Sequence, residues 1–314
     1  MDALSDVLST LRVSSMLSTR FEGRGAWAMH FPAYEHIKFG SVLSGRFYLW
    51  LEDGTPLALE TGDFYLMTYG QPFYSASDPT CPPQDGVAVI RSSRGEDGIA
   101  RYDGGGEAAE VSLASGRFTF EDDAADLLLR HLPPLIHLRA ADVGTSALAC
   151  ILDLLRLESS SLHVGADVAS SSLAALALVN ILRAWLNTTP RSAGWLGALS
   201  DAKIGKALSA MHAEPGRRWT LESLADHVAM SRTAFANRFR NRVGQPPLDY
   251  LQHWRMTLAR AALRHTDIPL PELAARFGYL SDTAFSSAFK RHTGVSPGRF
   301  RAKEKREQPR HRTG

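Results

Sequence analysis

The sequence predicts an α+β protein of two domains, an N-terminal β-barrel that carries a helical pair and a C-terminal domain made only of helices. Three observations predict this organisation. The hydrophobic pattern changes from short, turn-bounded runs to helical spacing near residue 122, the charge changes sign near residue 199, and the last hundred residues contain an internal repeat. A length of 314 residues suits two domains of ordinary size.

Composition excludes several classes of protein. Hydrophobic residues make up 44% of the chain and charged residues 22%, as in a globular protein and unlike a disordered one. Two cysteines are too few for a disulfide scaffold. The longest apolar stretch, residues 172–186, contains Asn180 and Arg183 and is shorter than the roughly 20 residues that a membrane span needs. The N-terminus lacks the basic start of a signal peptide, so we expect a cytoplasmic protein without a membrane partner.

The net charge of +2 hides an asymmetry between the two halves. Residues 1–198 hold 14 Lys and Arg against 23 Asp and Glu, a net charge of −9. Residues 199–314 hold 21 Lys and Arg against 10 Asp and Glu, a net charge of +11. A basic domain of this size attracts polyanions, and nucleic acid is the first candidate. The basic tail, residues 303–314, explains only part of the excess.

Residues 20–120 are typical of antiparallel strands. Short apolar and aromatic runs are separated by turns at Gly45, Asp53-Gly54 and Gly62-Asp63, and this close spacing favours a barrel or a sandwich. The interior of such a barrel is a candidate pocket for a small-molecule effector. The candidate pocket residues are Tyr34, His36, Arg46, Tyr48, Trp50 and Tyr65. Arg46, Tyr48 and Trp50 alternate along one strand and share a face, but the sequence leaves open whether that face is the inner one.

Helical spacing begins after residue 122. A short helix over 127–132 is predicted to end at Pro133-Pro134, and residues 147–158 and 169–186 predict two longer apolar helices. Two such helices would pack as an antiparallel pair, either on the barrel or against a second subunit. The turn-rich stretch that follows, residues 191–202, is the predicted linker between the domains.

The C-terminal half contains two copies of a segment of about fifty residues. Leu221, Leu224 and Ala225 recur at an offset of 49, and seven further residues between 231 and 247 recur at an offset of 50. Each copy predicts a helix, a short turn and a second helix, which is the helix-turn-helix arrangement. Residues 248–265, between the copies, predict one continuous helix of about 27 Å, long enough to hold two reading helices about one DNA turn apart.

Residues suited to helix ends stand at matching places in both copies. Thr220, Ser231 and Ser281 can accept hydrogen bonds from the free N–H groups at the start of a helix. Gly244 and Gly294 can take the left-handed conformation that ends one. The sequence therefore predicts where the helices of both copies begin and end.

The second helix of each copy presents a face suited to a DNA groove. In the first copy Phe235 and Phe239 lie four residues apart and point into the core, which leaves a polar face outward. Short hydrogen-bonding side chains on that face can reach base edges, while cations beside them meet phosphates. An ordinary solvated helix face would explain any one of these residues, but not the same pattern twice. The predicted DNA-binding residues are Arg232, Thr233, Ala236, Asn237, Arg238, Arg240 and Arg242 in the first copy, and Asp282, Thr283, Ser286, Ser287, Lys290 and Arg291 in the second.

Residues 204–301 strongly resemble the DNA-binding domain of the AraC/XylS family of transcription regulators. The resemblance rests on LESLADHVAMSRTAFANRFR, on Gly244 and Pro247, and on FGYLSDTAFSSAFKRHTGVSPGRFR. It implies two helix-turn-helix units, joined by a long helix, that read double-stranded promoter DNA, with RNA polymerase as a further partner. The recognition positions of the family fall on Arg232, Thr233, Ala236 and Asn237, and on Thr283, Ser286 and Ser287. Ala236 stands where a longer polar residue often sits, so one base contact is expected to be missing.

Residues 36–73 and 117–138 resemble the cupin-like sensor domain found in a branch of the same family. This resemblance implies a cupin-like sensor and dimerisation domain over 1–190, the linker over 191–202, an AraC-type DNA-binding domain over 203–302 and the basic tail over 303–314. The chain is thus predicted to be a sequence-specific transcription regulator that responds to an unidentified effector and forms a homodimer.

Two other functions remain open at the level of sequence. Metal-dependent enzymes also use cupin barrels, but His30 and His36 are six residues apart, and Phe73 and Tyr74 stand where a later His ligand often sits. We therefore expect no catalytic residues, no metal and no other cofactor. A redox sensor of the same fold is the second alternative, with Cys81 as the candidate thiol because it lies in a polar stretch. Cys150 lies in an apolar helix and is expected to pack inside.

Overall fold

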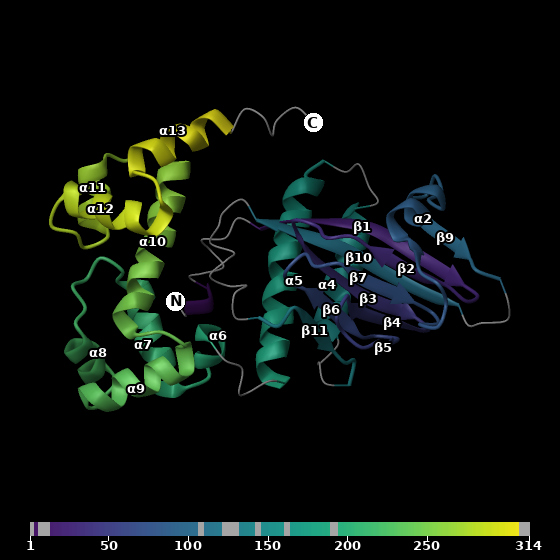
Figure 1. Ribbon diagram of the computed structural model, residues 1–314, viewed down its shortest axis with the longest axis horizontal. Helices are drawn as coiled ribbons and strands as arrows, with labels where there is room; N and C mark the ends of the chain where they lie inside the picture. The colour runs from purple at the N-terminus through teal and green to yellow at the C-terminus, as the bar shows by residue number, and fades with distance from the viewer. Residues whose placement is uncertain are drawn as a thin grey trace. The chain divides into compact units, whose positions relative to one another are not determined.

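The computed structural model describes residues 3–5, 13–105, 110–120, 132–141, 146–159, 164–188 and 194–307. The chain divides into two compact units (Figure 1). Of the described residues, 13–120 and 132–188 form one, which we call the β unit. Residues 194–307, together with 3–5, form the other, which we call the helical unit.

The β unit contains two sheets. One has the strand order β11-β6-β3-β10-β1-β9 and the other the order β5-β4-β7-β2-β8. Neighbouring strands are antiparallel, except that β9 runs parallel to β1 and β8 parallel to β2. Among the described strands the two sheets do not close into one ring, so the predicted barrel takes the form of two sheets. The strands are β1 (Val13–Arg24), β2 (Ala28–Phe31), β3 (Ile37–Ser44), β4 (Arg46–Leu51), β5 (Leu57–Glu60), β6 (Phe64–Met67), β7 (Phe73–Ala76), β8 (Gln84–Asp85), β9 (Ile99–Asp103), β10 (Val111–Phe120) and β11 (Leu135–Leu138).

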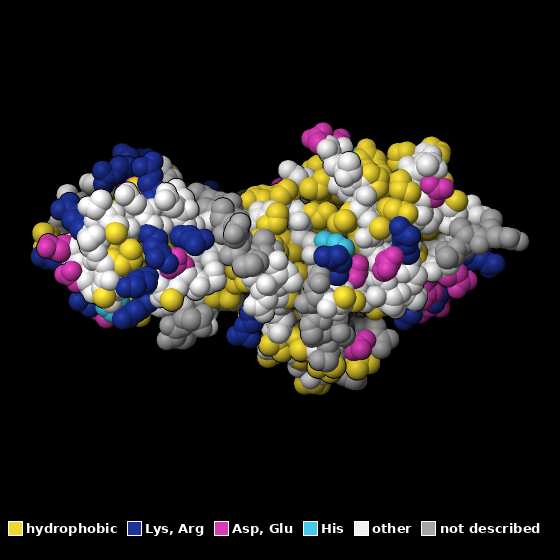
Figure 2. Space-filling view, turned by 90° about the horizontal axis from the view of Figure 1, so that it is seen from below, with side chains coloured by type: hydrophobic (Ala, Val, Ile, Leu, Met, Phe, Trp, Pro, Cys, Tyr) yellow, Lys and Arg dark blue, Asp and Glu magenta, His cyan; other side chains and the backbone are white. Residues whose placement is uncertain are grey.

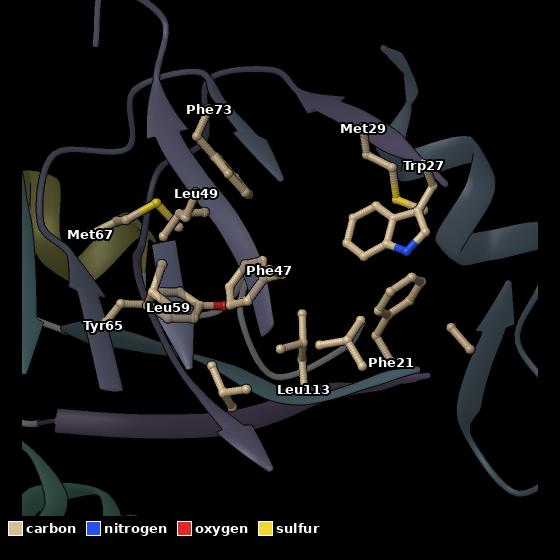
Figure 3. Packing of buried hydrophobic residues seen from close by; sticks show 13 residues of the cluster. Phe21, Trp27, Met29, Phe47, Leu49, Leu59, Tyr65, Met67, Phe73 and Leu113 are labelled. Carbon is tan, nitrogen blue, oxygen red and sulfur yellow. The ribbon is translucent and has the colours of Figure 1, made fainter. Parts of the chain in front are cut away.

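Side chains from both sheets meet in a shared core (Figure 3). Along β4, Phe47 and Leu49 are buried in this core, so by the alternation of a strand Arg46, Tyr48 and Trp50 face the other way. Two buried rings on the opposite face of the six-stranded sheet, Phe39 of β3 and Phe118 of β10, stack with centroids 4.3 Å apart.

Among the described residues, three helices pack on the sheets of the β unit. Helices α4 (Ser146–Ser159) and α5 (Ala166–Thr188) pack against each other and against the six-stranded sheet at β1, and α5 also contacts β11. The predictions for residues 147–158 and 169–186 are confirmed. Helix α2 (Gly86–Ser92) contacts β2, β8 and β9, and the carboxylate of the preceding residue, Asp85, caps it by accepting hydrogen bonds from two backbone amides of its first turn. The predicted short helix over 127–132 lies outside the described residues except for residue 132.

The helical unit contains the two predicted helix-turn-helix units, α8 with α9 and α11 with α12, and α10 runs between them (Figure 1). The single long helix predicted over 248–265 is confirmed. Helix α6 lies within the stretch predicted as a linker, and its Trp195 and Leu196 are fully buried where α6 contacts α9. The helices are α6 (Trp195–Ala198), α7 (Ala202–Ala213), α8 (Leu221–His227), α9 (Arg232–Val243), α10 (Pro247–His265), α11 (Leu270–Arg276), α12 (Asp282–Thr293) and α13 (Pro297–Glu307).

The predicted helix ends are also confirmed. The Thr220 hydroxyl accepts a hydrogen bond from the Ser223 amide, and the Ser223 hydroxyl accepts one from the Thr220 amide, which forms a capping box at the start of α8. Ser231 and Ser281 accept hydrogen bonds from amides in the first turns of α9 and α12. Gly244 and Gly294 end these two helices with φ values of 87° and 80°, a region that L side chains disfavour. No helix in the described part of the chain is both long enough and apolar enough to span a membrane.

Candidate functional site

The orientation of α9 and α12 is fixed by buried phenylalanine pairs. Phe235 and Phe239 have no exposed surface, and their ring centroids lie 5.7 Å apart. Phe285 and Phe289 are equally buried, with centroids 5.9 Å apart. Because residues of an α-helix follow one another at about 100°, burying these pairs decides which side chains of each helix point outward.

The outward face of α9 carries Thr233, Asn237 and Arg240, all exposed. These three residues were predicted to contact DNA, and the helical spacing places them opposite the phenylalanines. Asn241 is exposed on the same face, and our sequence analysis missed it although the same spacing would have included it. Ala236 is half-buried at the edge of the face. The centre of the face thus offers a hydroxyl, two amides and one guanidinium group.

The outward face of α12 repeats this layout with different side chains. Thr283, Ser287, Lys290 and Arg291 are exposed and stand 50 residues after their counterparts in α9. Ser286 is half-buried, like Ala236. The face of α12 therefore offers two hydroxyls in its first half and two cations in its second half.

Two predicted phosphate contacts, Arg238 and Arg242, face α7 instead of the outward face. The Arg238 guanidinium lies 2.9 Å from the Oδ2 atom of Asp201, and the Nε atom of Arg242 lies 3.4 Å from the same oxygen. The Asp201 carboxylate also accepts hydrogen bonds from two amides in the first turn of α7. Burial alone would raise the pKa of Asp201, but the hydrogen bonds from Arg238 and from these amides outweigh burial and lower it. Both arginines are still about half exposed, at 47% and 51%.

The first residues of the two recognition helices differ in charge. Arg232 begins α9 and Asp282 begins α12, and both are exposed. The Asp282 carboxylate accepts a hydrogen bond from the Thr283 hydroxyl at 3.3 Å and lies in the first turn, where the helix dipole stabilises an anion. Asp282 therefore supports the start of α12, while its charge would repel a phosphate.

Other basic residues of the helical unit hold its elements together. The Arg255 side chain donates hydrogen bonds to the backbone carbonyls of Pro215 and Arg217, at 2.6 and 2.8 Å. Arg264 pairs with Glu304 at 2.6 Å and so ties α10 to α13. Figure 2 shows further Lys and Arg side chains, in dark blue, spread over the surface of the helical unit. The positive charge of this half of the sequence is thus partly structural and partly displayed to solvent.

The β unit contains a cavity of about 450 Å³ that is partly open to solvent. Its walls come from both sheets and from α2, and several of the side chains labelled in Figure 3 line it, among them Phe21, Trp27, Met29 and Phe73. Cavities of roughly 300–1,000 Å³ are typical of small-molecule sites. The geometry can therefore accommodate a small organic ligand between the sheets.

The structure brings two of the six predicted pocket residues, His36 and Tyr65, to this cavity. The other four do not line it. On the opposite face of β4, the Arg46 guanidinium lies over the Tyr48 ring and Trp50 stacks on Tyr74. Tyr34 packs against the core, and its hydroxyl is buried without a hydrogen-bond partner among the described residues.

Three cationic side chains that our sequence analysis missed do line the cavity. They are Lys38 of β3, Arg91 of α2, and Arg94, which follows that helix. Strand alternation could have grouped Lys38 with Gly40 and Val42 on one face, but it could not have shown that this face points into the core. Gly40 leaves room on that face, because a Cβ atom there would collide with the Tyr65 ring.

Neither cysteine forms a disulfide, and Cys150 differs from expectation in its exposure. Cys81 is half-exposed. Cys150 is exposed on α4, so the expectation that it packs inside is wrong, since the residue falls on the side of this helix that faces solvent. The redox alternative stays a prediction. Within the described ranges, no three His, Cys, Asp or Glu residues are grouped so that they could hold a metal ion.

A repeated helix-turn-helix unit with polar recognition faces, on a chain that also contains a ligand-sized cavity, defines the class of DNA-binding transcription regulators. Residues 2–187 match a family described as Cupin, and residues 224–303 match one described as Helix-turn-helix domain. Both resemblances found in the sequence are thereby confirmed.

Relatives place the chain more narrowly. A putative AraC-like transcription regulator from Streptomyces antibioticus is 38% identical over 303 residues, which cover 96% of this chain and 98% of the relative. The HTH-type transcriptional regulator AlkR from Acinetobacter baylyi is 30% identical over 303 residues, covering 96% and 99% of the two chains. The chain belongs to the AraC-like family of transcription regulators. A crystal structure of an AraC-type regulator from Chromobacterium violaceum matches 37% of this chain and 99% of its own at 26% identity, with a TM-score of 0.33.

Proposed function

We propose that α9 and α12 enter successive major grooves of promoter DNA, and that a small molecule in the cavity of the β unit controls this binding. The observation that carries the proposal is the repeated recognition face, with short polar side chains opposite a buried phenylalanine pair in both units. Helix α10 is 19 residues and about 28 Å long, which suits the roughly 34 Å between neighbouring major grooves on one side of DNA. The domain bounds proposed for these roles are those predicted from the sequence.

The two recognition helices have different roles in this proposal. Asn237 and Asn241 on α9 are amides of the kind that bind adenine through two hydrogen bonds, and Arg240 suits guanine. The face of α12 combines small hydroxyls with Lys290 and Arg291, which suit phosphates. Helix α9 would therefore supply most of the sequence preference, and α12 a larger share of the salt-dependent affinity.

A homodimer through α4 and α5 is part of the proposal. Leu154 and Leu157 on α4 are exposed, as are Val168 and Leu176 on α5. Exposed apolar side chains that share one surface mark protein–protein contacts, and we propose that those of α4 and α5 form such a surface. Two copies would bring four recognition helices to one operator.

The remaining partners follow from the role in transcription. RNA polymerase is the proposed protein partner at the promoter, and the cytoplasm is the proposed location because promoter DNA lies there in the bacteria that contain the relatives. We propose no catalytic activity, since relatives that match nearly the whole chain carry the names of transcription regulators.

Binding of the purified chain to DNA from upstream of its own and neighbouring genes tests the proposal. We expect one of these fragments to bind more tightly than random DNA of equal length, and the affinity to fall steeply as salt rises. Equal affinity for all fragments at every salt concentration would contradict a sequence-specific regulator.

A further inference from the structure

The cavity of the β unit is lined by three cationic side chains and, among the described residues, by no carboxylate. Lys38, Arg91 and Arg94 contribute these positive side chains to its wall. His36 also lines the cavity, and burial, together with the nearby Lys38 and Arg117, lowers the pKa of its imidazole. His36 is therefore mostly uncharged near neutral pH, and its imidazole can donate one hydrogen bond and accept another from a ligand.

Lys38 is held at the cavity wall by aromatic rings. Its Nζ atom lies 4.7 Å from the ring centroid of Tyr34, 5.0 Å from that of Phe73 and 5.4 Å from that of Phe31. Cation–π attraction positions the ammonium group, yet a ring face is no substitute for a carboxylate, since three N–H donors need acceptors. The Lys38 side chain has no hydrogen bond or ion pair with another described residue, and Lys38 is the only lysine among residues 1–202.

A second cation stands directly opposite Lys38 on the neighbouring strand. Lys38 of β3 pairs in register with Arg117 of β10, so the two positive side chains lie on the same face of the sheet. Like charges at opposed positions destabilise a sheet. Burial and Arg117 both lower the pKa of Lys38, which shows that this environment disfavours the charged ammonium. An anion beside Lys38 would relieve both effects.

Most of the remaining cavity wall is apolar, and Tyr65, Ser75 and Ser115 are its other polar residues. Phe21, Trp27 and Met29 line one part of it, and Met67, Phe73 and Leu113 line another. Filled at the packing density of a protein interior, about 450 Å³ takes a ligand of roughly 15 to 20 non-hydrogen atoms. Such walls favour an aromatic or aliphatic body over a sugar, whose hydroxyls would each need a partner.

We propose that the effector is an organic anion, with its charged group on Lys38 and an apolar body between the two sheets. Arg91 and Arg94 supply further donors from the side of α2. The regulatory meaning of this ligand rests on the function proposed above, whereas the binding itself does not. The shared chemistry is one negative group on an apolar body, and carboxylate, sulfonate and phosphate are the alternatives that the experiment separates.

Isothermal titration calorimetry of the full chain tests this inference with naphthalene probes. 2-Naphthoate, naphthalene-2-sulfonate and 2-naphthyl phosphate carry the three head groups, and 2-naphthamide is a neutral compound of nearly the same shape. At least one anion is expected to bind about tenfold or more tightly than the amide. A hydrogen bond between charged groups contributes about a factor of ten to affinity, and the neutral amide lacks it. Equal affinity for the amide, or no heat with any of the three anions up to millimolar concentration, would overturn the inference.

Three variants show whether Lys38 holds the anion. Lys38→Met keeps the length and apolar contacts of the side chain and should weaken anion binding roughly ten- to hundredfold, with the amide unaffected. Lys38→Arg should retain most of the affinity, and it covers the case in which the methionine variant fails to fold. Arg46→Met, which removes a cation from the opposite face of β4, should bind as the parent does. Unchanged anion affinity in a folded Lys38→Met protein would contradict the assignment.

The anion-binding assay and the DNA-binding assay test the two proposals independently of each other. An anion that binds through Lys38 but leaves the affinity for DNA unchanged would support the site and contradict its proposed regulatory role. A chain that binds its DNA specifically but binds no anion would support the proposed DNA-binding function and contradict the anion site.

Discussion

The two helix-turn-helix units share one core and differ in the charges around it. Both bury a phenylalanine pair, begin the second helix at a serine and end it at a glycine of positive φ. Outside this core, Arg238 of the first unit corresponds to the buried Ala288 of the second, and Arg242 corresponds to His292. The first recognition helix is tied to α7 through Asp201, whereas the second packs through an apolar residue at the equivalent place.

This difference shows that the two copies keep the residues that form the core and differ in the residues on the surface. The core positions leave little choice, since a cavity or a lost cap costs a few kcal/mol. The outward positions contact solvent in the free protein, so they can vary without loss of the fold. The two recognition helices therefore share their geometry and differ in the DNA chemistry they offer.

The largest expected effect tests the shared core. Phe235→Ala and Phe285→Ala should each lower the free energy of unfolding of the helical unit by about 3–5 kcal/mol, since each opens a cavity in a fully buried site. Urea denaturation followed by tryptophan fluorescence measures both, with Leu248→Ala, at an exposed position, as a control. A loss in only one of the two variants would show that the units are not equivalent in packing.

The next largest effect distinguishes the outward face of α9 from that of α12 in sequence-specific DNA binding. Asn237→Ala should cost about 1–3 kcal/mol of binding to the preferred sequence and little on random DNA, because a base contact is lost. Ser287→Ala should cost less, since a single hydroxyl makes a weaker contact. Fluorescence anisotropy on specific and random duplexes measures both variants. Equal losses on the two duplexes for Asn237→Ala would mean that this residue touches only the backbone.

The tie through Asp201 should have a moderate effect with a defined pH dependence. Asp201→Asn keeps a residue that caps α7 but loses the ionic partner of Arg238 and Arg242, so the helical unit should be less stable by about 1–2 kcal/mol at pH 7. Because the folded-state pKa of Asp201 is lowered, its contribution is present above the unfolded value near 4 and disappears as the pH falls through the folded value.

Denaturation curves of the parent and of Asp201→Asn between about pH 7 and pH 2 check this sign. The difference in stability should narrow at the acidic end. A constant difference over the whole range would mean that the carboxylate charge has no part in holding α9.

The smallest effect concerns the cations of α12. Lys290→Ala and Arg291→Ala should each reduce the slope of log affinity against log salt by about 1, because each removes one phosphate contact. Arg238→Ala should change the slope less, since this guanidinium is already paired with Asp201. A larger change for Arg238→Ala than for Lys290→Ala would show that the arginine leaves Asp201 to bind DNA.

Sequence reasoning reached the helical unit more completely than the β unit, for physical reasons. Helix ends depend on residues a few positions apart, so Thr220, Ser231 and Gly244 could be placed from local spacing. The partner of Arg238 is 37 residues away in sequence and depends on how α7 packs, which no local pattern contains.

In the β unit the sequence could group residues on one face of a strand, but it could not decide which face points into the core. Alternation along β4 groups Arg46 with Tyr48 and Trp50 equally well whether they face inward or outward, and only the packing of Phe47 and Leu49 decides it. Lys38 was overlooked for the same reason, since a lysine in a strand normally faces solvent.

Selection of bound sequences from a random duplex library by the full chain tests the central claim most directly. If α9 and α12 read successive major grooves, the enriched DNA should contain two short elements whose centres lie about 10 to 10.5 base pairs apart. The element read by α9 should be the more strongly conserved of the two, and Asn237→Ala should relax it selectively. Enrichment of no sequence, or of a single element that Asn237→Ala leaves unchanged, would contradict the account.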